Sequence, residues 1–228
     1  MTNTLSNWSK TQSLALTAMF GAIIFLFTFT PIGFIQVPFI GSATIMHMPV
    51  IIGAIILGPK YGAVLGFMFG LSSFIFASTM STTLTAFAFT PLRPVPGTDS
   101  GSPWALIIAF VPRILVGVVA PFVYVFVARI LPKRMNAVSL AVSAFVASMT
   151  NTVLVVNLLF FLFQEPWSYA RTAAGVADPQ ITYAFITGTM IGVFGVAEAI
   201  AAVIIVPAIC LALFAVEKRM PKRSRAVV

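Results

Sequence analysis

Long apolar stretches separated by polar breaks run along the whole sequence. A helix needs about 20 apolar residues, each adding about 1.5 Å, to cross the roughly 30 Å hydrocarbon core of a bilayer. Six stretches approach or exceed that length, at 12–30, 43–58, 61–79, 104–131, 137–163 and 186–216. The pattern predicts an all-α polytopic membrane protein, a six-transmembrane-helix bundle that forms one integral domain over residues 1–228.

The polar breaks alternate between short basic ones and long ones with few charges. The long breaks, 31–42, 81–103 and 164–182, are rich in turn-forming residues and carry only Arg93 and Arg171 among the basic residues. Basic residues concentrate on the cytoplasmic side of membrane proteins, so we expect both termini, 1–11 and 217–228, in the cytoplasm and the long loops outside. Apart from Arg113, the remaining basic residues lie in or next to the short breaks and the two ends: Lys10, Lys60, Arg129, Lys133, Arg134, Lys218, Arg219, Lys222, Arg223 and Arg225.

Composition narrows the class of protein. Hydrophobic residues make up 60% of the chain and charged residues 8%, whereas a soluble domain carries about 25% charged residues. The net charge of +8 belongs to cytoplasmic flanks rather than to a basic patch interleaved with stacking aromatics, which argues against nucleic-acid binding. Cys210 stands alone, so the chain contains neither a disulfide framework nor a thiolate metal site.

Ionisable side chains within the predicted helices mark a candidate site, because a charge near the bilayer centre costs about 2.5–3.5 kcal/mol. Counted from the cytoplasmic end of each helix at about 1.5 Å per residue, Arg113 lies about 24 Å up and Asn151 about 22 Å up. By the same count His47 lies about 20 Å up and Glu198 about 27 Å up. Four helices thus place polar groups in one layer beneath the long loops, which predicts a small-molecule site open to the outside.

Each candidate also has a purely structural interpretation. Arg113 and Glu198 can neutralise one another as an ion pair, and a lone His47 beside a proline can cap or pack a helix. Asn151 and Asn157 can form hydrogen bonds between helices. Further candidates for substrate contact are Arg93, Thr44 and Ser72. Apolar loop residues that either cap a pocket or, for the two Trp, anchor the chain at the membrane interface are Phe34, Phe39, Phe87, Phe89, Trp104 and Trp167.

The first predicted helix carries small residues at helical spacing. Ala15, Ala18, Gly21 and Ala22 lie on one side of it, and such faces let helices approach closely in lipid. The face can pack against a helix of the same chain or dock a separate membrane partner.

Sequence motifs of enzymes are missing. The chain has one His and one Cys and contains no GxSxG, HExxH, P-loop or GxGxxG motif. We therefore expect no enzyme activity, no cofactor and no ATP hydrolysis by the chain itself.

Several short motifs carry a family resemblance. The chain resembles the substrate-binding (S) components of energy-coupling factor (ECF) vitamin transporters, and within them the pantothenate type, over nearly its whole length. The resemblance rests on Thr44-Ile45-Met46-His47-Met48-Pro49, Leu57-Gly58-Pro59-Lys60-Tyr61-Gly62-Ala63, Val111-Pro112-Arg113-Ile114-Leu115, Thr150-Asn151-Thr152-Val153-Leu154 and Glu198-Ala199-Ile200.

The resemblance implies a protein of the cell membrane that captures a vitamin from outside. It further implies docking through the alanine-rich first helix onto a transmembrane coupling protein (T component) that is driven by two cytoplasmic ATPases. The alanine motif maps to Ala18 and Ala22, with Ala15 before it. Met19 interrupts a second copy that would begin at Ala15.

Pantothenate is a small anion with a carboxylate, an amide and two hydroxyls. Arg113 is suited to the carboxylate, and Asn151, Asn157 or His47 to the amide and hydroxyls, while Glu198 would hold Arg113 or accept from a hydroxyl. For a cationic vitamin such as thiamine the roles of Arg113 and Glu198 reverse. Cobalamin, folate, riboflavin and pyridoxine remain alternatives, as does a self-sufficient secondary carrier, which would usually need more helices or an inverted repeat.

Overall fold

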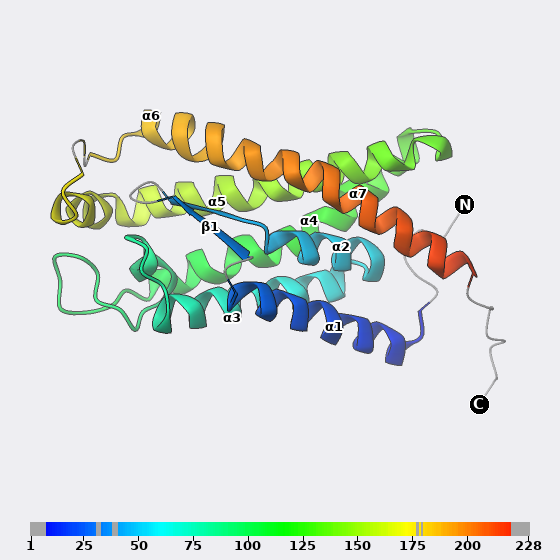
Figure 1. Ribbon diagram of the computed structural model, residues 1–228, viewed down its shortest axis with the longest axis horizontal. Coiled ribbons are helices and arrows are strands. Elements are labelled where there is room, and N and C mark those ends of the chain that lie inside the picture. The colour runs from blue at the N-terminus through cyan, green and yellow to red at the C-terminus, as the bar shows by residue number, and fades with distance from the viewer. Residues whose placement is uncertain (1–7, 31–32, 38–40, 177, 179, 220–228) are drawn as a thin grey trace.

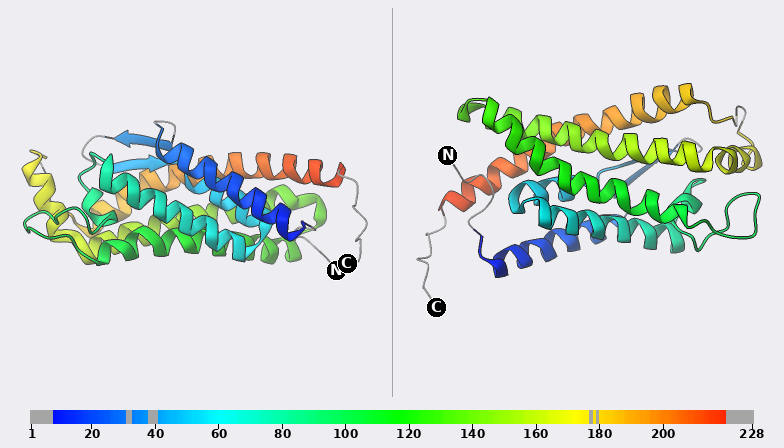
Figure 2. Two further views of the ribbon diagram at one scale, coloured as in Figure 1. Left: turned by 90° about the horizontal axis from the view of Figure 1, so that it is seen from below. Right: turned by 180° about the vertical axis from the view of Figure 1, so that it is seen from behind.

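The protein is an elongated helical bundle in which the helices run roughly along one long axis (Figures 1 and 2). The computed structural model describes residues 8–30, 33–37, 41–176, 178 and 180–219. Expectations for Phe39 and for the basic residues from Lys222 to Arg225 lie outside these residues. Its elements in chain order are α1 (Lys10–Thr28), β1 (Phe34–Val37), β2 (Gly41–Thr44), α2 (His47–Leu57), α3 (Pro59–Thr79), the 3-10 helix η2 (Ala86–Phe89), α4 (Trp104–Ile130), the 3-10 helix η3 (Lys133–Met135), α5 (Asn136–Ala173), α6 (Tyr183–Phe185), the π-helix η4 (Ile186–Gly195) and α7 (Val196–Arg219).

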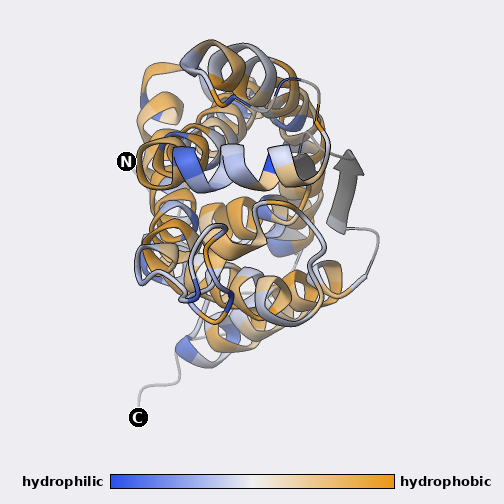
Figure 3. Cartoon of the chain, turned by 90° about the vertical axis from the view of Figure 1, so that its left-hand side faces the viewer, coloured by the Kyte–Doolittle hydropathy of each residue, from blue (hydrophilic) through white to orange (hydrophobic). Residues whose placement is uncertain are grey.

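Five helical segments in the described part of the chain are long and apolar enough to cross a membrane. They are α1, α3, α4, α5 and the continuous run from α6 to α7. The sixth predicted span is represented by α2, which has 11 residues, all of them buried. Most of the helical ribbon carries hydrophobic residues when the molecule is viewed along the bundle (Figure 3), as expected for helices that face lipid.

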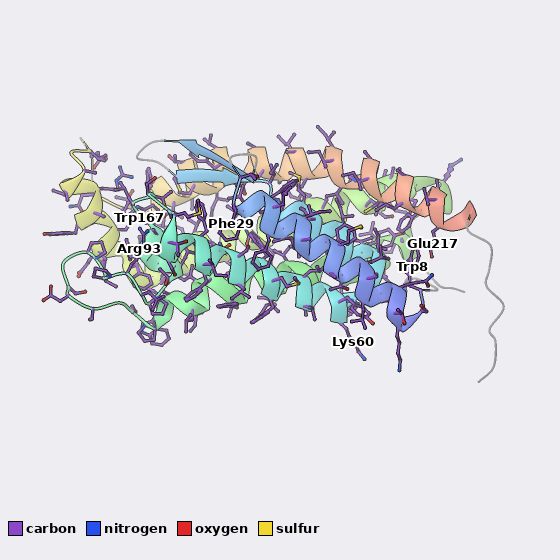
Figure 4. All side chains as sticks on the ribbon, turned by 60° about the horizontal axis from the view of Figure 1, so that its bottom comes forward. Trp8, Phe29, Lys60, Arg93, Trp167 and Glu217 are labelled. Carbon is purple, nitrogen blue, oxygen red and sulfur yellow. The ribbon has the colours of Figure 1, made fainter. Side chains whose placement is uncertain are left out.

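The two ends of the bundle differ. The start of α1, the α2–α3 turn, the α4–α5 connection and the end of α7 lie together at one end (Figure 1). Lys60, Trp8 and Glu217 mark this end, whereas Arg93 and Trp167 mark the opposite one (Figure 4). The described parts of the short basic breaks therefore share one end, and the described parts of the long breaks 81–103 and 164–182 share the other.

Glycine lets α3 and α4 approach closely. A Cβ added to Gly62 would come within 2.0 Å of the carbonyl oxygen of Gly117, and one added to Gly66 within 2.3 Å of the carbonyl oxygen of Arg113. Gly70 continues the same face of α3 against Ala109. Because glycines four residues apart line one side of a helix, this stripe fixes where α4 presents Arg113.

A short β-hairpin is formed by residues 34–37 and 41–44, where the sequence predicted an irregular loop followed by the start of a helix. Strands β1 and β2 pair antiparallel, with Phe34 opposite Thr44, and form a local departure within a bundle that is otherwise helical, as the sequence predicted. The helix expected from residue 43 begins instead at His47. The hairpin lies beside η4 on the side of the bundle (Figure 1).

The last two long helices also differ from expectation. The helix expected to end at 163 continues to Ala173 across a kink at Phe163, where φ is −140°. Pro166 follows the kink. Because proline lacks an amide hydrogen and its ring clashes with the preceding turn, it accounts for a kink after which the helix continues. The helix expected from 186 begins at Tyr183, and its first ten residues after α6 are π-helical.

Candidate functional site

A cavity of about 150 Å³ lies in the half of the bundle that carries Trp167 and the loop after α3. Helices α3, α4, α5, η4 and α7 form its sides, and the loop after α3, Thr44 and Trp167 border it. One water molecule needs roughly 10–15 Å³ on the same measure, so the space suits a small solute rather than a single water. Its polar lining residues are Thr44, Ser73, Ser81, Thr83, Thr85, Arg113, Asn151, Thr152 and Glu198.

Arg113 lines the cavity from α4 and is only 7% exposed. Its Nη1 donates to the carbonyl oxygen of Ile108 at 2.6 Å, and the guanidinium lies over the rings of Phe69 and Phe89 at 5.4 and 4.9 Å from their centroids. Its Nε is buried without a hydrogen-bond partner among the described residues. The guanidinium is thus held in place and retains an unused donor.

Two more cavity-lining residues carry unused polar atoms. Asn151 Oδ1 on α5 and Ser73 Oγ on α3 are buried and have no hydrogen-bond partner within the described residues. A buried polar group left without a partner costs roughly 1–3 kcal/mol. Three such groups around one cavity indicate a place where a solute supplies the missing acceptors and donors.

Glu198 also lines the cavity, but its carboxylate is occupied. Oε1 accepts from the backbone N–H of Thr44, and Oε2 accepts from the hydroxyl of Thr152 at 3.2 Å. No ion pair between Glu198 and Arg113 is present in the described part of the chain.

His47 and Ser72 are fully buried beside the cavity rather than on its wall. Nε2 of His47 shares a hydrogen bond with Ser148 Oγ at 3.0 Å. Ser72 Oγ accepts from Thr28 Oγ1 at 2.9 Å and donates to the Phe69 carbonyl. Both side chains connect helices here.

Asn157 and Arg93 do not line the cavity. Asn157 donates to the carbonyl oxygen of Val153 at 2.7 Å and accepts from Tyr183 at 3.4 Å. Arg93 is half-buried in the loop at the end of the bundle opposite Lys60 (Figure 4). The structure therefore brings Arg113, Asn151, Glu198 and Thr44 together, and it leaves the other four candidates off the wall.

Aromatic residues supply much of the cavity wall, and only some of them were predicted from the sequence. Phe89 and Trp167 line it; Trp167 is 2% exposed, whereas Trp104 is largely exposed in the manner of an interfacial residue. Phe69 and Phe194 were missed because an aromatic residue in an apolar helix gives no distinguishing pattern. The side chain of Phe34 lies outside what the structure describes.

Arg171 is a second buried arginine that the sequence analysis treated as an outer-loop charge. It donates through Nη2 to the carbonyl oxygen of Asp178 and lies over the ring of Phe185 at 4.6 Å from the centroid. Arg171 lies one helical turn after Trp167, so its hydrogen bond attaches Asp178 to α5 next to the cavity-lining Trp167.

The small residues of α1 divide into two sets. Gly21 is buried, and a Cβ there would meet Met68. Ala15, Ala18 and Ala22 are exposed, along with Leu14, Met19 and Leu26. These three alanines do not pack against the described remainder of the chain.

Comparison with known proteins gives two matches. The family model described as "ECF transporter, substrate-specific component" matches residues 12–210. A curated relative, the pantothenic acid transporter PanT of Lactococcus lactis subsp. cremoris (strain MG1363), is 40% identical over 206 residues, which cover 90% of this chain and 95% of the relative.

Proposed function

We propose that this chain, which belongs to the substrate-specific components of ECF transporters, captures pantothenate from outside the cell. The observation that carries the proposal is the cavity in which Arg113, Asn151 and Ser73 present buried polar atoms that have no hydrogen-bond partner among the residues the structure describes. The relative is named as a transporter of pantothenic acid, and the chemistry of this cavity suits the same solute.

Arg113 is the anchor for the carboxylate. Its charge is buried against the rings of Phe69 and Phe89, where a hydrogen bond to an anion is stronger than in water. Asn151 Oδ1 accepts from the amide or a hydroxyl of the vitamin, and Ser73 serves a second hydroxyl. Phe69, Phe89 and Trp167 enclose the aliphatic part.

The arrangement in the membrane follows from the charged ends. The chain crosses six times, with α2 as the short second span, and the end with Lys10, Lys60, Arg129 and Arg134 faces the cytoplasm. Both termini lie on that side, and the cavity opens to the outside. The protein resides in the cell membrane.

Transport requires partners in this proposal. The exposed Ala15, Ala18 and Ala22 stripe on α1 docks a T component, since small side chains permit close helix contact in lipid. Two cytoplasmic ATPases supply the energy.

Calorimetric titration of the purified protein in detergent with a vitamin panel tests the function. We expect pantothenate to bind with a submicromolar Kd, and thiamine, riboflavin, pyridoxine, folate and cobalamin not to bind. Tight binding of another vitamin instead would reassign the cargo. Sustained uptake by the chain alone in liposomes, without ATP, would identify a self-sufficient carrier.

A further inference from the structure

The carboxylate of Glu198 connects three separate parts of the chain. Glu198 lies in the first turn of α7, its Oε1 accepts from the Thr44 amide at the end of β2, and its Oε2 accepts from Thr152 on α5. Glu198 is 9% exposed. Both carboxylate oxygens accept hydrogen bonds from protein donors, whereas Arg113 keeps a buried donor that has no partner among the described residues.

A second contact attaches the same junction deeper in the bundle. His47, three residues after Thr44, shares a hydrogen bond with Ser148 of α5. Ser148 and Thr152 are one helical turn apart, so the hairpin-to-α2 junction is attached to α5 at two successive levels, directly through Ser148 and indirectly through Glu198 to Thr152. The His47 contact is fully buried, whereas the Glu198 contact borders the cavity.

The two contacts have different mechanical consequences. The deep one fixes the start of α2, which is packed within the core. The one at the cavity fixes only the last residue of β2 and, through the ladder with β1, the hairpin. Breaking the Glu198 contact would release the end of β2 from α7 and α5 while α2 stays in place.

We propose that Glu198 is a positioning residue that holds the end of strand β2, at Thr44, on the cavity wall and thereby sets how slowly the bound vitamin leaves. It acts through the Thr44 amide and does not contact the vitamin. This inference rests on the proposed function for its cargo, but the hairpin attachment itself exists without any vitamin.

Two conservative substitutions of Glu198 distinguish the effect of its side-chain length from the effect of its charge. Glu198→Gln keeps the length and an oxygen for the Thr44 amide, and its NH₂ can donate to Thr152. Glu198→Asp keeps the charge but is one methylene shorter, so it cannot reach both donors. A positioning role therefore tolerates Gln and rejects Asp, whereas a role in balancing the charge of Arg113 predicts the reverse.

Hydrogen–deuterium exchange of the vitamin-free protein, followed in peptides covering 41–46, is the first readout. We expect exchange to rise about tenfold or more in Glu198→Asp and to stay within about threefold of wild type in Glu198→Gln. Thr152→Val, which removes one donor, should give an intermediate rise. Glu165→Ala, which removes an exposed carboxylate of α5, is the matched control.

Stopped-flow binding, monitored by tryptophan fluorescence, is the second readout. Glu198→Asp should speed vitamin dissociation about tenfold or more with little change in association, and Glu198→Gln should restore slow dissociation. Unchanged hairpin exchange in Glu198→Asp, or loss of binding in Glu198→Gln with retention in Glu198→Asp, would overturn the inference. Because the exchange assay uses no vitamin, it still decides the inference if the cargo is not pantothenate.

Discussion

Gly66 of α3 lies directly against the backbone carbonyl of Arg113 on α4, so that a Cβ on Gly66 would come within 2.3 Å of that oxygen. The obstacle is backbone and cannot rotate away. A glycine one helix away therefore sets the depth and direction of the proposed anchor.

Substituting this glycine should disturb both packing and binding. Gly66→Ala forces α3 and α4 apart, and overpacking of this kind costs about 1–3 kcal/mol. We expect a lower thermal midpoint in detergent and weaker vitamin binding, because the Arg113 guanidinium shifts with its helix. Gly188→Ala, where an added Cβ meets nothing within 4 Å, should change neither. Wild-type stability of Gly66→Ala would contradict the close contact.

Asn151 offers a test in which stability and affinity move in opposite directions. Its Oδ1 is buried without a partner in the described part of the chain, so Asn151→Leu removes an unsatisfied polar group and should stabilise the vitamin-free protein. The same change should weaken binding roughly 3- to 10-fold, since a neutral hydrogen bond contributes about 0.5–1.5 kcal/mol. Thermal shift and calorimetry measure the two effects. Asn157→Leu, off the cavity, is the control whose affinity should not change.

The α1 face predicts a defect in assembly without a defect in binding. Ala18→Trp places a large ring in the exposed alanine stripe, which would keep a partner helix from approaching. We expect loss of co-purification with the T component and ATPases, while vitamin affinity of the isolated protein stays the same. Ile204→Trp, at an exposed position on α7, should assemble normally. An intact complex with Ala18→Trp would move the docking surface elsewhere.

Much of the architecture could be predicted because lipid imposes length and polarity on each span. The depth count placed Arg113, Asn151 and Glu198 in one layer, and all three line one cavity. Period and length cannot reveal tertiary hydrogen bonds, however. The bonds from His47 to Ser148 and from Thr44 to Glu198 join residues 101 and 154 positions apart, so the occupied state of Glu198 was not foreseeable.

Local chemistry misled the prediction at particular residues. Pro166 normally ends a helix, yet α5 continues through the kink at Phe163 to Ala173. The apolar residues before His47 suggested helix, but 41–44 pair as a strand with 34–37. A π-helix over 186–195 has no sequence pattern that distinguishes it from an α-helix.

The central claim is that Arg113 holds the carboxylate of the vitamin. Panthenol, in which a hydroxymethyl group replaces that carboxylate, tests it by calorimetry against pantothenate. Wild-type protein should prefer pantothenate by about 10- to 100-fold, since a hydrogen bond between charged groups contributes about 1.5–3 kcal/mol. Arg113→Ala should abolish this preference, and Arg93→Ala should leave it intact. Equal affinity of wild type for both compounds, or a preference that survives in Arg113→Ala, would contradict the account.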